Sequence, residues 1–283
     1  MTRKFKQGFW LIMMRLSILV SVLFLLVFLF LIFSKGSSAL SLSFLLEAPK
    51  AGMTKGGIFP AIIGTLYLTG LTILFSFPIG VLAAIYLTEY AREGILVNTI
   101  RTAINTLAGV PSIVFGLFGL AVFVNMFHFG VSVLSGALTL AILVLPTIIN
   151  ASEEAIKSVP NSFREAAYAL GATKRQSIMK VVIPAALPNI LTGAIISIGR
   201  AAGETAPILF TAATFYTRKF PTSIFDEVMA LPYHIYALMT EGTSPQTQIP
   251  IAYGSAVVLL LLVLSIDLIA IILRYRMRKA KTW

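Results

Sequence analysis

The feature that most constrains this chain is a series of apolar runs long enough to cross a lipid bilayer. A helix needs about 20 such residues to span the hydrocarbon core. Of the 283 residues, 58% are hydrophobic and only 12% are charged, and the mean hydropathy is +0.92. A water-soluble domain of this size needs far more polar surface around its core. The sequence therefore predicts an all-α, polytopic membrane protein.

The apolar runs predict six spans: Phe9–Phe33, Ala61–Leu87, Ala103–Phe127, Val133–Ile149, Pro188–Thr214 and Ile251–Leu273. The first run begins after basic residues and ends near Ser37–Ala39, as a signal peptide does. Its uninterrupted part, Leu16–Phe33, has 18 residues and exceeds the usual length of about 7–15, so we expect an uncleaved span.

Within the third span, Gly109–Ser112 is expected to kink or open the helix, because proline removes a helix hydrogen bond.

Lysine and arginine are distributed unevenly between the two predicted faces. Sixteen of them fall on the face that holds both termini, and five fall on the other: Lys35, Lys50, Lys55, Arg218 and Lys219. Basic residues concentrate on the cytoplasmic side of membrane proteins. We therefore expect both termini in the cytoplasm, and the net charge of +11 is explained by topology rather than by nucleic-acid binding.

The chain divides into four predicted parts along its length. Residues 1–60 form an N-terminal tail, the first span and an external loop, and residues 61–214 form a core with a cytoplasmic loop at 150–188. Residues 215–250 form a second external loop, and residues 251–283 the last span and a basic tail.

The chain has no cysteine and only two histidines, which excludes thiolate chemistry and disfavours a metal site. No catalytic residue is predicted.

The cytoplasmic loop Asn150–Pro188 has the local signals of a helical hairpin. Ser162-x-x-Glu165 and Thr173-x-x-Gln176 both have the form of a capping box. Gly171 between them supplies a left-handed helix stop, and Pro184 is expected to end the second helix near Val182. Two short helices need a surface to pack against, which is either their own bundle and the lipid headgroups or a separate cytoplasmic protein.

The spacing of Glu165-Ala166-Ala167, Gly171 and Val181-x-Ile183-Pro184 resembles the EAA loop of ABC importer permeases, E-A-A-x3-G-x9-I-x-L-P. The resemblance implies a type I-like permease of six helices, whose loop docks in a groove of an ATPase subunit through Glu165, Ala166, Ala167 and Gly171. The chain lacks a G-x-x-x-x-G-K-[ST] phosphate loop. It is therefore not expected to be an enzyme or to bind a cofactor, and ATP with magnesium is assigned to the partner.

Arg200 and Glu204 are the only charges in the fifth predicted span. Counted from Pro188, Arg200 lies about 18 Å deep at 1.5 Å per residue, where an arginine costs about 2.5–3.5 kcal/mol. Glu204 follows four residues later, on the same helix face. The pair is either a neutralised lock between helices or part of a pathway in which the guanidinium contacts an oxyanion.

Other polar residues in the spans have open roles. Thr65, Thr69 and Thr72 recur at three- and four-residue spacing and either line the pathway or bond their own helix. Asp267 lies seven residues before Arg274, and we expect it to form a structural ion pair or to extend toward the headgroups.

Three segments resemble phosphate importer permeases of the PstA type: Gly64–Ala91, Leu107–Phe123 and Gly199–Ala212. The resemblance implies a bacterial or archaeal cytoplasmic-membrane subunit that translocates inorganic phosphate past Arg200 and Glu204. It implies as partners a paralogous permease of the PstC type, two ATP-binding subunits and an extracytoplasmic phosphate-binding protein. A permease for sulfate, molybdate or another oxyanion, and a gradient-driven secondary transporter, remain the alternatives.

Overall fold

The structure is a computed structural model that describes residues 3–217 and 220–279. Five helical stretches in these residues are long and apolar enough to cross a bilayer: Phe9–Ala39, Phe59–Tyr90, Val133–Lys157, Lys174–Gly203 and Pro245–Arg276. A sixth arises if a bent helix pair counts as one span. The predicted all-α, polytopic fold is confirmed. Arg218, Lys219 and Lys281, which entered the charge distribution above, lie outside the described residues.

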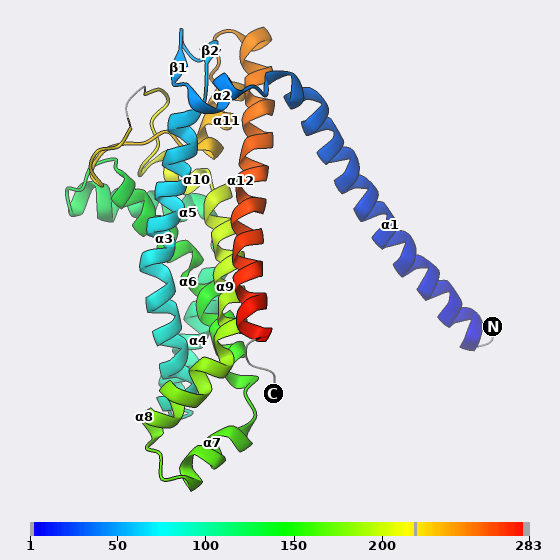
Figure 1. Cartoon of the computed structure of the whole chain (residues 1–283), viewed down its shortest axis with the longest axis vertical. Helices are drawn as coiled ribbons and strands as arrows, with labels where there is room; N and C mark the ends of the chain where they lie inside the picture. Colours follow the sequence, from blue (N-terminus) through cyan, green and yellow to red (C-terminus); the bar gives the residue numbers. More distant parts are fainter. Residues whose placement is uncertain (1–2, 218–219, 280–283) are drawn as a thin grey trace.

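The first helix, α1 (Arg3–Gly36), stands apart from the rest of the chain (Figure 1). The most apolar window of this span is 0% buried. At its end, Gly36 packs closely on Tyr253 of α12 (Pro245–Lys279), and the Lys35 ammonium lies 5.1 Å from the centre of the Tyr253 ring. A helix this apolar requires lipid or another membrane chain around the rest of its length.

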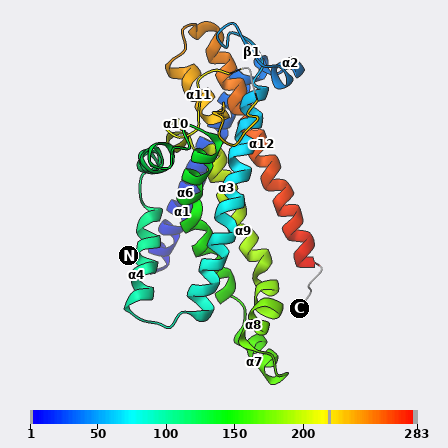
Figure 2. The ribbon, with the colours of Figure 1, turned by 90° about the vertical axis from the view of Figure 1, so that its left-hand side faces the viewer.

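Four long helices form the body of the molecule side by side: α3 (Phe59–Ile85), α6 (Val133–Lys157), α9 (Ile183–Gly203) and α12 (Figures 1 and 2). Glycines permit their close approach. A Cβ atom on Gly80 of α3 would lie 2.6 Å from a methyl carbon of Ile148, and one on Gly193 of α9 would lie 2.5 Å from Cβ of Ala151. Small residues at helix crossings are the usual means of packing within membranes.

The third predicted span is not one continuous helix. It is divided into α4 (Ile95–Ala108), α5 (Ser112–Gly119) and the π-helical η3 (Leu120–Met126), and the two halves are bent by 102°. The break falls at Gly109–Pro111, the position expected to open the helix. Pro111 has no N–H to continue the hydrogen-bond ladder, so α5 starts in a new direction.

The fifth span begins earlier than predicted. The short α8 (Lys174–Ser177) continues through the π-helical η4 (Ile178–Val182) into α9. The prediction that Pro184 ends this helix is therefore wrong. The N–H of Ile183 bonds Ile178 O in the π pattern, and Pro184 follows where the ladder returns to α spacing. A missing N–H is tolerated at such a shift in register.

The two ends of the body differ in structure. One end, here called the hairpin end, carries α7 (Asn161–Ala169) and α8 (Figures 1 and 2). The opposite end, here called the α11 end, carries the smaller elements: η1 (Ser37–Ala39), α2 (Leu42–Leu46), the antiparallel pair β1 (Pro49–Lys50) and β2 (Lys55–Gly56), and α11 (Leu231–Thr240).

The second external loop contains the helix α11. Before this helix, Val228 forms a parallel bridge with Ala213, and Pro232 lies in the first turn of α11. Proline is favoured there because the first N–H groups of a helix have no partner within the helix. His234 of α11 is 2% exposed, and burial lowers the pKa of its imidazole to about 4.

Candidate functional site

Arg200 lies in the last turn of α9, not at the centre of a span. The helix ends at Gly203, and Glu204 has extended backbone angles (φ −72°, ψ 132°). The prediction of a continuous helix to Thr214 is therefore wrong. Pro207 accounts for the break, because its ring would clash with the carbonyl four residues earlier, at Gly203. The short α10 (Ala206–Leu209) follows in its place.

Arg200 and Glu204 form an ion pair despite this break. Nε of Arg200 donates to Oε1 of Glu204 at 3.5 Å, and the two side chains are 35% and 17% exposed. The negative end of the α9 dipole also favours a cation in the last turn. The guanidinium therefore has one long ionic contact and remains partly open, so it retains donors for another acceptor.

Glu204, Thr65 and Thr69 line one small cavity, between α3 and the end of α9. Its volume is about 10 Å³, which is room for no more than one water molecule. The hydroxyl of Thr69 is buried there without a hydrogen-bond partner. Three of the four predicted pathway residues thus meet at one place, in a conformation closed to any larger anion.

The other two threonine hydroxyls are engaged. Thr65 donates to Ala61 O at 2.8 Å and accepts from the Leu231 N–H at 2.9 Å, while Thr72 donates to Leu68 O at 2.7 Å. The contact with Leu231 fastens the start of α11 to α3, across 166 positions of sequence. Thr65 therefore joins α3 to α11 and also lines the cavity.

Replacing Thr65 by valine is expected to destabilise the protein, because the buried Leu231 N–H loses its acceptor at a cost of about 1–3 kcal/mol. Thr69→Val is the matched control, since it removes a hydroxyl that has no partner, and it is expected to be neutral or stabilising. Thermal unfolding of both purified variants checks this. Equal stability of the two variants would contradict the role of Thr65, and Thr65→Ser should restore the wild-type value.

Asp267 does not form the predicted ion pair with Arg274. One of its carboxylate oxygens is buried without a hydrogen-bond partner. The other lies 3.6 Å from where a Cβ atom on Gly199 would stand. This carboxylate is therefore directed toward Gly199 of α9, a placement that its sequence distance from Arg274 did not reveal.

The hairpin at the other end contains the predicted left-handed corner. Gly171 has φ +79°, its N–H bonds Tyr168 O at 2.9 Å, and the Ala172 N–H bonds Ala167 O at 3.0 Å. These two bonds form a Schellman motif, which satisfies the last carbonyls of α7. The Thr173–Gln176 capping box is confirmed, since both of its bonds are present.

The first predicted capping box, Ser162 with Glu165, is wrong. Helix α7 begins at Asn161, directly after Pro160, and no side chain caps it. Ser162 therefore lies within the first turn of the helix and not at the capping position. Glu165 and Ala166 are exposed and Ala167 is buried, so the first two of the predicted docking residues are accessible and the third packs inward. The tip residue Leu170 is 90% exposed.

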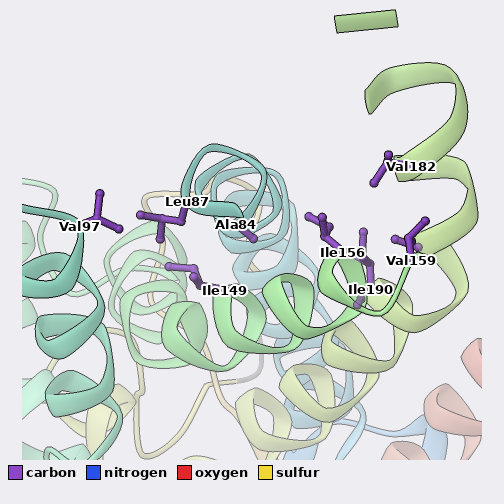
Figure 3. Packing of buried hydrophobic residues seen from close by; sticks show 10 residues of the cluster. Ala84, Leu87, Val97, Ile149, Ile156, Val159, Val182 and Ile190 are labelled. Atoms are coloured by element: carbon purple, nitrogen blue, oxygen red, sulfur yellow. The ribbon is translucent and has the colours of Figure 1, made fainter. Parts of the chain in front are cut away.

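The base of the hairpin packs into an apolar cluster at the ends of several helices (Figure 3). Its buried members come from α3, η2 (Tyr86–Tyr90), α4, α6, η4 and α9, and the loop residue Val159 joins them: Ala84, Leu87, Val97, Ile149, Ala155, Ile156, Val159, Val182, Ala186 and Ile190. Phe163 of α7 packs against this cluster. The hairpin is therefore a rigid projection of the bundle, whose tip residue Leu170 has no apolar cover.

Charged residues that sequence reasoning missed surround this cluster. Glu153, which is buried, pairs with Arg101 at 3.4 Å and with Lys157 at 2.9 Å, and Glu89 pairs with Arg164 at 2.6 Å. Glu153 and Lys157 are four residues apart on α6, a spacing that could have predicted their pair. The Arg101–Glu153 and Glu89–Arg164 pairs join distant segments and leave no local spacing signal.

A broken bundle of membrane-length helices, a projecting hairpin and a partly open arginine are together typical of a multi-pass membrane permease. Residues 76–279 match the model of the binding-protein-dependent transport system inner membrane component family, and the chain belongs to that family. This membership agrees with the type I-like permease fold expected from the hairpin motif.

Several curated relatives resemble this chain over most of their length. A probable ABC transporter permease, YqgI of Bacillus subtilis, is 36% identical and covers 83% of each chain. Phosphate transport system permease protein PstA of Haemophilus influenzae is 36% identical, over 89% of this chain and 88% of its own. The probable PstA of Methanocaldococcus jannaschii is 39% identical, over 76% and 74%.

A solved structure gives the same fold. A chain of a bacterial alginate ABC transporter, crystallised with an alginate-bound periplasmic protein, superposes with a TM-score of 0.68 at 19% identity. The match covers 95% of this chain and 94% of that one. The relatives are permease components of transporters rather than enzymes in themselves.

Proposed function

We propose that this chain is the permease subunit of an ATP-driven importer that carries inorganic phosphate across the cytoplasmic membrane. The observation that carries the proposal is the partly exposed Arg200, the sole charge of α9, held by Glu204 beside a closed cavity. A planar guanidinium is well suited to bind the oxygens of a tetrahedral oxyanion. The names of several relatives, which are phosphate transport permeases, support this substrate.

In the proposed cycle, Arg200 and Glu204 act as an exchangeable pair. An entering anion replaces the carboxylate as acceptor for the guanidinium, and Glu204 holds the side chain in position between events. The cavity next to Glu204 is only about 10 Å³, far less than phosphate needs. Passage therefore requires α3 and the end of α9 to separate, which an alternating-access cycle supplies.

The hairpin gives the chain a place in a larger assembly. We assign its exposed tip to docking on one of two ATP-binding subunits, which hold ATP and magnesium. The second permease is a paralogue of the PstC type, and a phosphate-binding protein docks from outside at the α11 end. Both termini face the cytoplasm, lipid surrounds the spans, and the chain itself has no catalytic role and does not bind nucleic acid.

Sulfate, molybdate or another oxyanion is the second candidate substrate, because an arginine beside a carboxylate serves any tetrahedral oxyanion. A gradient-driven transporter is the other alternative, in which the same pair takes part in proton coupling.

Uptake into vesicles tests these possibilities. The assembled complex is reconstituted with ATP inside and binding protein outside, and radiolabelled phosphate and sulfate are compared. We expect phosphate uptake that depends on ATP and exceeds sulfate uptake at least about tenfold, the effect of 1.4 kcal/mol of preference. Stronger sulfate uptake would reject the substrate. Uptake by the isolated chain without ATP would favour the gradient-driven alternative.

A further inference from the structure

The hairpin holds the end of α3 between its two helices. Arg164 of α7 pairs with Glu89 of η2, the π-helical segment that ends α3, at 2.6 Å, with Nε donating to the same oxygen at 3.2 Å. From α8, the Lys174 ammonium lies 5.1 Å from the centre of the Tyr90 ring, also in η2. Both helices of the hairpin therefore contact one segment that precedes them by more than 70 residues.

Arg164 also secures the hairpin to α6. It donates to Ile156 O of α6 at 3.2 Å and to Val159 O, in the loop that follows α6, at 2.8 Å. The side chains of Arg164 and Glu89 are 16% and 9% exposed, so little water competes for the pair. One guanidinium thus joins α6, α7 and the end of α3.

The hairpin is connected to the long helices in two ways, by continuous backbone and by side-chain contacts. Helix α9 follows the hairpin through the continuous backbone of η4, and α6 precedes it by a short loop. Helix α3 has no such backbone connection to the hairpin. Its links are side-chain contacts, and α3 carries the Thr65 and Thr69 wall of the cavity beside Glu204.

We propose that the Glu89–Arg164 pair transmits movement of the docked hairpin to α3, so that the cavity opens when the partner ATPase closes. Glu89 and Arg164 are positioning residues, because neither touches the substrate. The segment η2 is π-helical, and single π turns within helices are frequent at functional sites. The inference rests on the proposed function, because a coupling ratio exists only where a partner hydrolyses ATP.

The test is the number of anions imported per ATP hydrolysed by the reconstituted complex. Glu89→Gln removes the charge but leaves Arg164 its bonds to Ile156 O and Val159 O. We expect this ratio to fall about fivefold or more, the low end of measured coupling between sites, with complex yield and ATPase rate within twofold of wild type. Glu89→Asp keeps the carboxylate and should recover part of the ratio.

Glu93→Gln is the matched control, because it removes an exposed carboxylate from the adjacent loop, and it should leave the ratio unchanged. An unchanged ratio in Glu89→Gln, including a parallel fall of transport and ATPase rate, would overturn the inference. If Glu89→Gln lowers complex yield, Glu89→Asp decides the matter, since its shorter side chain keeps the charge but weakens the contact with Arg164. A ratio below wild type in Glu89→Asp supports the inference, and a wild-type ratio rejects it.

The identity of the substrate does not affect this test. If the wild-type complex imports sulfate instead of phosphate, the ratio is measured with sulfate. That result would reject phosphate as the substrate but would not reject the role of Glu89 and Arg164.

Discussion

Replacing Arg200 with glutamine is expected to abolish phosphate uptake while the complex remains assembled. Glutamine retains hydrogen-bonding capacity but has no charge and cannot present the two parallel N–H donors of a guanidinium. Each charge-assisted hydrogen bond lost from the anion is worth about 1.5–3 kcal/mol. Two such bonds correspond to a loss of roughly 100-fold or more in uptake.

Assembly should survive this change because of where Arg200 lies. Its side chain is 35% exposed and forms one long contact with Glu204, so the fold depends little on it. Arg92→Gln, in an exposed loop at the hairpin end, is the control for loss of a positive charge. Glu204→Gln separates the two proposed roles, because it should weaken uptake less than Arg200→Gln if the carboxylate only holds the guanidinium. Wild-type uptake in Arg200→Gln would make the pair a structural lock between elements.

The parts of the fold that sequence predicted well depend on signals within a few residues. The spans follow from local hydropathy, and the hairpin corner follows from Gly171 and the capping pair Thr173 and Gln176. The prediction of a capping box at the start of α7, in contrast, failed. Helix α7 begins at Asn161, so Ser162 lies inside the helix and cannot cap its start.

The candidate site was predictable in composition but not in shape. An arginine and a glutamate four residues apart in an apolar run predict an ion pair, and the structure contains that pair. The predicted unbroken helix around them was wrong because the break imposed by Pro207 was given too little weight, while Pro184 was given too much. The contact of Thr65 with Leu231 joins residues 166 positions apart, and no single-sequence signal reports such a distance.

Gly171→Val is expected to detach the ATPase from the permease. A β-branched residue at φ +79° faces a steric cost of roughly 1–2 kcal/mol or more, and relief of that strain breaks the two Schellman bonds, each worth about 0.5–1.5 kcal/mol. The chain bears the smaller of these two costs, roughly 1–2 kcal/mol, which should weaken docking by about five- to thirtyfold. Co-purification of the ATP-binding subunit with the tagged permease measures this.

The cause is backbone conformation and not crowding, since a Cβ atom on Gly171 would have no neighbour within 4 Å. Gly171→Asn should therefore retain much of the docking, because asparagine tolerates the left-handed conformation. Gly94→Val is the matched control at the same end of the molecule, where φ is 176° and any residue fits. If Gly171→Val binds the ATPase as well as Gly94→Val does, the corner does not set the docking geometry, and the exposed Glu165 and Leu170 must suffice without it.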